Sequence, residues 1–177
     1  MKITILGYSG SGKSTLARKF GEYYDIPVLH LDTVQFLPGW IERDRDEACI
    51  IVKEFMNNKS WVIDGNYSDF QQKERLEQAD KIILLNFPRR ICIYRAIKRY
   101  YKNRNKTRKD MAKGCIEKID LEFIWWILYE GRSKEKRQHY KVIEYKYKDK
   151  ITVLKNPKEV KMYIKTGGSN GFENIRK

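Results

Sequence analysis

The stretch KITILGYSGSGKST, residues 2–15, decides how the rest of the sequence is interpreted. Its first half is a short apolar run that ends in glycine, which is typical of a buried strand. Residues 7–14 then fit the pattern GxxxxGK followed by Ser or Thr at every required position. In such a loop the glycines let backbone N–H groups point into one concavity, and the following helix adds its N-terminal N–H groups and dipole. The stretch therefore predicts a strand, an anion-binding loop and a helix in direct succession.

The residue types in this loop suit the phosphates of a nucleotide and a magnesium ion. Lys13 can reach the β- and γ-phosphates, and the hydroxyl of Ser14 can bind Mg²⁺. ATP and Mg²⁺ are therefore the expected cofactors, although GTP fits the same residues as a donor. The alternative, a chance glycine-rich turn, is disfavoured by the complete motif in its strand–helix context. The residues expected to bind the nucleotide are Gly7, Ser9, Gly10, Ser11, Gly12, Lys13, Ser14 and Thr15.

Strands and helices alternate along the rest of the chain. Short apolar runs predict four further strands, at residues 28–31, 61–63, 81–87 and 151–154. Apolar residues at helical spacing and the positions of prolines predict helices at residues 14–24, 46–56, 88–101, 120–147 and 157–165. Residues 33–43 contain Pro38-Gly39 and predict a loop.

This alternation predicts an α/β protein with a parallel sheet between two layers of helices. Together with the loop at residues 7–14, it indicates the three-layer α/β/α P-loop NTPase fold with a five-stranded parallel sheet. We expect a single domain over residues 1–165, with its core in residues 1–101 and 120–165 and a basic excursion at residues 102–119. Residues 166–177 are then a C-terminal tail.

Composition narrows the class of protein. Hydrophobic residues make up 41% and charged residues 34% of the 177 residues, which is typical of a globular chain. The longest apolar run, residues 123–129, is too short to cross a bilayer, so no membrane partner is expected. The three cysteines lie far apart without a CxxC pair, which argues against a zinc site and a disulfide framework. We therefore expect a soluble, reduced, cytoplasmic protein.

The net charge of +14 is unevenly spread along the chain. Residues 88–150 hold 20 Lys/Arg and 8 Asp/Glu, whereas residues 1–87 hold 11 Lys/Arg and 13 Asp/Glu. A basic segment of this kind suits a polyanionic partner, which is nucleotide phosphates, nucleic acid or an anionic surface. The alternative interpretation is a solvent-exposed helical face that only aids solubility.

Two aspartates follow predicted strands and are candidates for the phosphoryl-transfer chemistry. Asp64 can hold Mg²⁺ directly or through water together with Ser14, and this role is favoured over that of a turn residue before Gly65. Asp32 can take a proton from a phosphoryl acceptor or bind it, and a role in capping the following turn is equally open. His30 is interpreted as a half-buried strand residue because a lone histidine is weak evidence for catalysis.

Arginines in the basic segment form a second set of candidates. Arg95 and Arg99 are four residues apart and share a face of one predicted helix. Their planar guanidinium groups can clamp a phosphate chain and stabilise the charge of the transferring group, and Arg132 and Arg137 can close onto the same phosphates. The alternative is a solvent-facing basic stripe. The expected catalytic residues are thus Lys13, Asp32, Arg95, Arg99, Arg132 and Arg137.

The order of these motifs resembles the nucleoside monophosphate kinases, adenylate kinase in particular, over most of residues 1–165. Asp64-Gly65 looks like the start of that family's DGFPR motif, although residues 66–68, Asn-Tyr-Ser, depart from it and lack its arginine. The resemblance implies a P-loop kinase-like domain over residues 1–165 with a helical lid region. It implies further that Arg95 and Arg99 contact ATP and that the basic excursion at residues 102–119 is the lid. It also implies that Arg132 and Arg137 are the arginines after the lid. The acceptor is then expected near Asp32, Asp64 and Arg43, with Arg45 as the alternative to Arg43.

Three further segments point to a narrower group. HLDTVQFLPGW (residues 30–40), WVIDGNYS (residues 61–68) and EFIWWILYEGR (residues 122–132) resemble bacterial proteins named "DNA topology modulation protein", which are related to adenylate kinase. That name implies an effect on DNA and says nothing about chemistry.

Two hypotheses of different classes follow from the sequence. The first is an ATP-binding phosphotransferase that moves the γ-phosphoryl group to a nucleotide or another small acceptor. The second is a nucleotide-gated DNA- or RNA-binding protein that holds a phosphate backbone with residues 88–150. Salt distinguishes them, because backbone binding weakens steeply with salt, whereas a kinase pocket selects one acceptor.

Overall fold

The computed structural model describes residues 1–108 and 110–166, so nearly all of the predicted tail lies outside the described residues. Five parallel strands form one sheet in the order β2-β5-β1-β6-β7. Every residue of β5 is buried, as are all but the first of β1 and β6, which explains their continuous apolar sequences. The strands are β1 (Lys2–Gly7), β2 (Val28–His30), β5 (Trp61–Asp64), β6 (Lys81–Leu85) and β7 (Ile151–Leu154).

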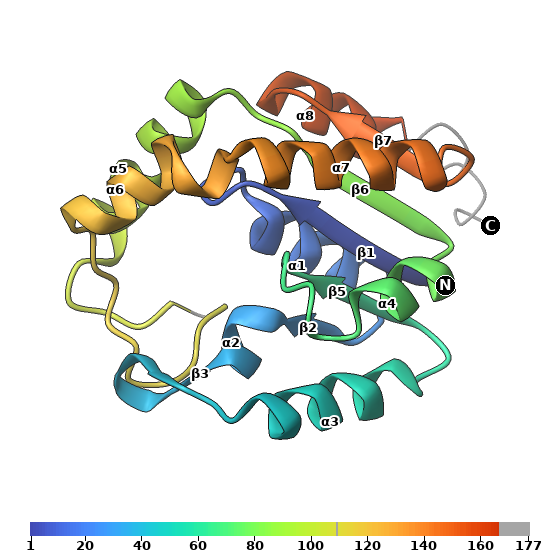
Figure 1. Cartoon of the computed structure of the whole chain (residues 1–177), viewed down its shortest axis with the longest axis horizontal. Helices are drawn as coiled ribbons and strands as arrows, with labels where there is room; N and C mark the ends of the chain where they lie inside the picture. Colours follow the sequence, from blue (N-terminus) through green and yellow to red (C-terminus); the bar gives the residue numbers. More distant parts are fainter. Residues whose placement is uncertain (109, 167–177) are drawn as a thin grey trace.

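Helices cover both faces of this sheet (Figure 1). On one face α1 and α8 lie together, and the rings of Phe20 and Tyr163 are 6.4 Å apart. On the other face α4 and α7 are joined by a hydrogen bond between Gln72 and His139. These four helices are α1 (Lys13–Tyr24), α4 (Gln72–Gln78), α7 (Lys134–Lys146) and α8 (Pro157–Lys165). The arrangement confirms the predicted α/β/α layers and the five-stranded parallel sheet. Helix α4 was not predicted.

The segment predicted as a loop at residues 33–43 is ordered, and this prediction was wrong. It contains α2 (Leu31–Gln35) and a small hairpin of β3 (Phe36–Leu37) and β4 (Ile41–Glu42) around the 3-10 turn η1 (Pro38–Trp40). Leu31, predicted as a strand residue, begins α2, because it and Val34 lie one turn apart and are both buried. At the hairpin, Gly39 and Trp40 both adopt positive φ angles and reverse the chain.

The prediction of a single long helix at residues 120–147 was also wrong, because this segment forms two helices separated by a turn. These are α6 (Leu121–Leu128) and α7, with the 3-10 turn η2 (Glu130–Arg132) between them. Tyr129 has non-helical φ and ψ angles of −129° and −69°, and the Ser133 side chain accepts a hydrogen bond from the Lys136 N–H. Ser133 therefore caps the start of a new helix. The helical spacing of apolar residues continues through this point of the sequence and does not reveal the cap.

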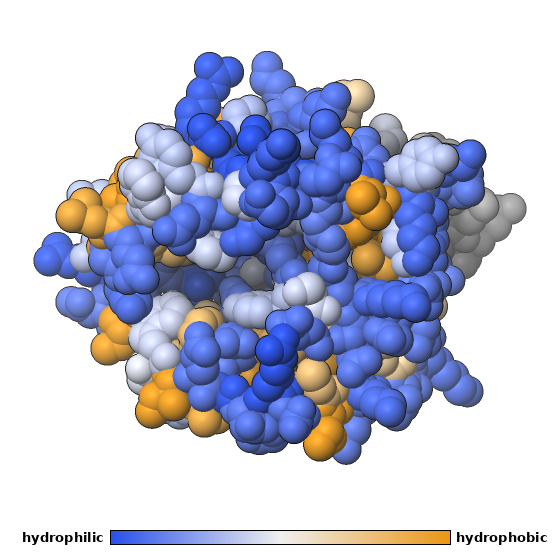
Figure 2. All heavy atoms as spheres, in the orientation of Figure 1, coloured by the Kyte–Doolittle hydropathy of each residue, from blue (hydrophilic) through white to orange (hydrophobic). Residues whose placement is uncertain are grey.

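The excursion after α5 lies against the hairpin. Helix α5 (Arg89–Asn103) runs two residues beyond its predicted end, and the chain then descends to β3, as the yellow segment in Figure 1 shows. The Cys115 thiol donates to the Leu37 carbonyl at 3.2 Å, and the Trp40 indole donates to the Ile116 carbonyl at 3.0 Å. In the same orientation, Figure 2 shows the molecule hollowed at the end where the strands finish, with mainly hydrophilic residues around the hollow.

Over the part of the chain that the structure describes, no helix combines the length and apolar character needed to cross a membrane.

Candidate functional site

The loop between β1 and α1 can only be built with glycine at its key positions. Gly7, Gly10 and Gly12 have φ angles of +142°, +78° and +97°. A Cβ atom at Gly10 would overlap the carbonyl oxygen of Cys92 in α5. The loop therefore packs its backbone directly against α5, and this contact leaves no room for any side chain at position 10.

The concave side of this loop fits a phosphate group. Gly12 precedes α1, and no side chain among the described residues caps the first turn of this helix. The Ser11 hydroxyl is buried, and it is one of the few described buried polar groups without a hydrogen-bond partner. Unpaired N–H donors at a helix start and an orphaned hydroxyl are the groups that a bound phosphate would satisfy.

Lys13 lies where it can serve such a phosphate. Its Nζ atom donates to the Tyr8 carbonyl at 3.3 Å, within the same loop. Burial lowers the pKa of Lys13, and this effect outweighs the opposing charges of Asp32 and Asp64. The structure thus brings three of the predicted site residues into one electrostatic neighbourhood, and a bound polyanion would favour the protonated lysine.

Ser14 and Asp64 meet as predicted for a magnesium site. The Ser14 hydroxyl donates to Asp64 Oδ2 at 2.9 Å, and Asp64 is 4% exposed. No group of three or more His, Cys, Asp or Glu residues among residues 1–108 and 110–166 could hold a metal ion on its own. A magnesium ion at a P-loop does not need such a group, because phosphate oxygens and water complete its coordination. Ser14 and Asp64 therefore fit Mg²⁺ bound together with a nucleotide.

His30 has a partner that its sequence position did not reveal. Its Nδ1 atom contacts Asp64 Oδ1 across the β2–β5 pair, where the register places the two residues side by side. Burial alone would lower the pKa of His30, but the hydrogen bond and charge of Asp64 outweigh it and raise this pKa. The signal available in the sequence was that both residues end neighbouring strands.

The residues that depart from the DGFPR pattern organise the site. The Asn66 side chain accepts from the Gly7 N–H at 3.0 Å and donates to the Gly7 carbonyl at 2.7 Å, which ties this turn to the start of the P-loop. The Tyr67 hydroxyl donates to Asp32 Oδ1 at 2.9 Å, and burial together with the Asp32 charge raises the pKa of Tyr67. Asp32 itself lies in the first turn of α2, beyond the end of β2.

Arg95 and Arg99 both lie near the loop. The Arg95 guanidinium lies against Gly12, where a Cβ atom would be 2.5 Å from Nη2. Arg99 donates to Glu117 Oε1 at 2.8 Å, and its charge contributes to the lowered pKa of Lys13. The ATP contacts that the resemblance to adenylate kinase implies for the two arginines stay predictions.

Carboxylates of the 104–119 segment already hold some of these arginines. Glu117 pairs with Arg99 and Arg108, and Asp110 pairs with Arg108 at 2.9 Å and with Arg18 of α1 at 3.6 Å. Burial would raise the pKa of Asp110, but Arg108 and other nearby groups lower it overall. The segment is thus fastened both to α1 and to α5 by ion pairs.

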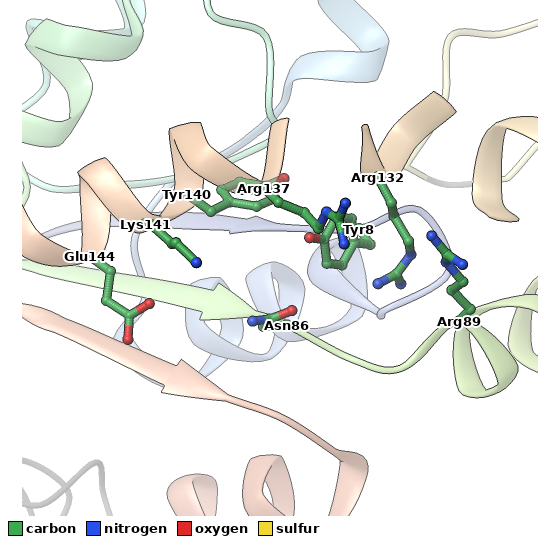
Figure 3. Close-up of a pocket in the computed structure, with 8 residues that line it drawn as sticks. All are labelled: Tyr8, Asn86, Arg89, Arg132, Arg137, Tyr140, Lys141 and Glu144. Carbon is green, nitrogen blue, oxygen red and sulfur yellow. The ribbon is translucent and has the colours of Figure 1, made fainter. Parts of the chain in front are cut away.

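Three of the arginines predicted to bind the acceptor or the phosphoryl group contact other parts of the protein. The Arg43 Nε atom donates to the Val34 carbonyl at 2.8 Å, and its guanidinium pairs with Glu47, so it braces α2 against α3 (Arg45–Met56). Arg132 is buried and donates to the Phe87 carbonyl at 2.8 Å. Arg137 lies on α7 beside Tyr8 (Figure 3). Their predicted roles toward acceptor and phosphoryl group stay predictions, as does that of Thr15, which is exposed at the start of α1.

Sequence reasoning missed Arg75. Its side chain in α4 is fully buried and donates to the carbonyls of Phe70, Tyr67 and Gly65 at 2.8, 2.8 and 3.4 Å. Burial lowers the pKa of Arg75 to about 10. Arg75 therefore holds the turn that carries Asn66 and Tyr67. Residue type and spacing gave no signal for this role.

Comparisons with known proteins identify no family for this chain. No model of a known protein family matches the chain, and no curated protein matches it. Two solved structures that match it are a shikimate kinase from Bacteroides thetaiotaomicron and an uncharacterized protein from Eubacterium ventriosum. Each is 15% identical over 96% of this chain, covering 97% and 99% of the other chain, with TM-scores of 0.49 and 0.46. The fold assignment rests on the sheet order and the loop geometry.

Replacing Arg75 by methionine should destabilise the protein by about 3 kcal/mol, because three buried carbonyl groups lose their donor. Urea unfolding measures the change. Lys73→Met, on the exposed side of the same helix, is the control and should change stability by less than about 0.5 kcal/mol. Equal effects of the two substitutions would contradict a structural role for Arg75.

The pair of His30 and Asp64 predicts how stability depends on pH without metal. The raised pKa of His30 in the folded state means that its contribution to stability is present below about pH 6.5, its unfolded value. That contribution is lost as the pH rises through the folded pKa. Urea unfolding in EDTA at several pH values should show this loss in the wild type and not in His30→Asn. Parallel profiles would overturn the assignment.

Proposed function

We propose that this chain is an ATP-dependent phosphotransferase, which moves the γ-phosphoryl group of MgATP to a small acceptor. The observation that supports this most is the contact of Ser14 with Asp64 beside the uncapped start of α1. It combines a phosphate cradle with oxygen ligands suited to Mg²⁺, on a fold that places ligands at the carboxyl ends of its strands.

The donor side of the proposed reaction uses the loop and three cations. Backbone N–H groups of the loop would hold the phosphates, with the nucleotide-bound Mg²⁺ at Ser14 and Asp64. Lys13, Arg95 and Arg99 surround the same region and would stabilise the charge that spreads over the phosphoryl oxygens. Magnesium, when bound, neutralises phosphate charge, and the chain itself supplies the orientation.

The acceptor side centres on Asp32. Its charge raises the pKa of Lys13 against the effect of burial, and Tyr67 holds its carboxylate through a hydrogen bond. This supports a place for Asp32 beside the proposed phosphoryl group. A hydroxyl or phosphate oxygen of the acceptor placed there could give its proton to Asp32 or be oriented by it. The hairpin that follows α2 is bonded to the segment after α5, and this contact could help to exclude water from the reaction.

The predicted alternative, nucleic acid binding by residues 88–150, is less well supported. Arg99 and Arg108 of that segment are paired with Glu117, which neutralises part of the positive charge that a phosphate backbone would meet. Nucleic acid binding stays a prediction that salt dependence can test.

The direct test is phosphoryl transfer from MgATP to a panel of acceptors. The panel holds ribo- and deoxynucleoside monophosphates, nucleosides and small hydroxylated metabolites, and ADP and phosphorylated product are both measured. One acceptor class should be phosphorylated, and Lys13→Ala should lower the rate at least about 100-fold because it removes a phosphate-binding charge.

The matched control is Lys19→Ala, an exposed lysine one and a half turns further along α1, which should keep activity within about twofold. Slow ATP hydrolysis independent of every acceptor would count against the proposed function, as would equal losses in the two lysine variants.

The magnesium site gives a separate prediction. Asp64→Asn keeps the size of the side chain and removes its charge, so the Mg²⁺ concentration for half-maximal activity should rise about 10- to 100-fold. Asp46→Asn, on the exposed start of α3, is the control and should leave the Mg²⁺ requirement unchanged. A magnesium titration at saturating ATP measures both, and an unchanged requirement in Asp64→Asn would remove Asp64 from the metal site.

A further inference from the structure

A second basic concavity lies beside the P-loop but outside the phosphate cradle, which is the concave side of the loop at residues 7–14. It is a groove of about 360 Å³ between α7 and the end of β6, and we call it the α7 groove (Figure 3). Tyr8 is the only residue of the P-loop motif among those that line it. It is formed on the face of the sheet covered by α7, whereas the cradle faces the start of α1 on the other face. Lys13, Arg95 and Arg99 take no part in lining it.

Four cationic side chains from three elements converge on this groove. Arg89 is the first residue of α5, Arg132 belongs to η2, and Arg137 and Lys141 lie one turn apart on α7. In Figure 3 the three guanidinium groups reach toward Tyr8 from different sides. All three also influence the Tyr8 hydroxyl electrostatically, which places their charges around one point.

One of these cations is built into the floor of the groove. The guanidinium carbon of Arg132 lies 3.5 Å from the centroid of the Tyr8 ring, and its Nη2 atom donates to the Phe87 carbonyl. Tyr140 packs edge-on against Tyr8 at 5.3 Å and completes an aromatic floor. Arg89, Arg137 and Lys141 are exposed around it, and the Arg89 guanidinium also packs over the ring of Tyr129.

The charge of the groove is not balanced by the protein. Among the described residues, none of these four cations forms an ion pair with a carboxylate, and Glu144 is the only acid that lines the groove. By contrast, Arg18, Arg99 and Arg108 near the cradle each have an acidic partner. A concavity lined by one sign of charge attracts and concentrates counterions of the other sign.

We propose that the α7 groove binds the phosphate group of a small phosphate monoester. Planar guanidinium forks from different elements suit the three terminal oxygens of a dianionic phosphate. The volume holds a molecule of about the size of a sugar phosphate, the tyrosine floor suits its less polar part, and Glu144 can accept a hydrogen bond from a hydroxyl or amino group at the far end. This site is independent of nucleotide binding in the cradle.

The test uses phenyl phosphate as the probe, with calorimetric titration of Lys13→Ala protein so that the cradle contributes little. The double variant Arg89→Gln/Lys141→Gln, made in this background, should weaken binding at least about tenfold, because two charged donors are lost. The control Arg90→Gln/Lys148→Gln removes the same charge from exposed positions outside the groove and should change the affinity less than twofold. Thermal unfolding establishes that all variants are folded.

The source of the phosphate is distinguished in the same experiment. Dimethyl phosphate and a single-stranded oligodeoxynucleotide present the monoanionic diester of a nucleic acid backbone, and both should compete at least about tenfold more weakly than phenyl phosphate. The proposal is overturned by equal losses in the two double variants, by undetectable binding of phenyl phosphate, or by an oligonucleotide that competes better than the monoester. Failure of phosphotransferase activity would leave these results unaffected.

Discussion

The contact between the backbone of Gly10 and the carbonyl of Cys92 is the constraint on which the rest of the site depends. It joins the P-loop to α5 with no side chain between them, so the position of the loop fixes the position of the helix. One turn further along α5, Arg95 then lies against Gly12, and a second turn brings Arg99 close to Lys13. The cations around the phosphate position are therefore placed by a backbone contact, and their own flexible side chains need only small adjustments.

A second layer of contacts holds the other wall of the site. The turn after β5 is tied to the P-loop by Asn66, is bonded to Asp32 by Tyr67, and is supported from below by the buried guanidinium of Arg75. Asp64 and Asp32, which we propose for the metal site and the acceptor site, are thus connected through one short turn. Buried carbonyl groups are costly to leave without donors, so the hydrogen bonds from Arg75 link the shape of this turn to the stability of the fold.

The parts of the molecule that could be predicted from sequence are those governed by local rules. Continuous apolar runs identified all five strands of the sheet, and the glycine pattern identified the P-loop, because burial and positive φ angles leave direct marks on residue type. The contact between Ser14 and Asp64 followed from their places at the start of the helix after the first strand and at the end of a neighbouring strand. The break at Tyr129 and the hairpin after α2 depend on tertiary packing, and no periodicity reports them. The places of Arg132 and Arg137 also depend on tertiary packing. Their spacing within one predicted helix could not show whether they face the phosphate-binding loop or the α7 groove.

The ion pairs of the 104–119 segment affect how strongly a polyanion could bind at this site. Glu117 and Asp110 already neutralise Arg99, Arg108 and Arg18, so the segment rests on the hairpin without a ligand. If the proposed triphosphate engages Arg99, it would take the place of the Glu117 carboxylate, and the number of charges in contact with Arg99 would change little. Nucleotide binding would then be an exchange of anions, in which the affinity reflects the difference between phosphate and carboxylate at the same guanidinium and not the full strength of either pairing.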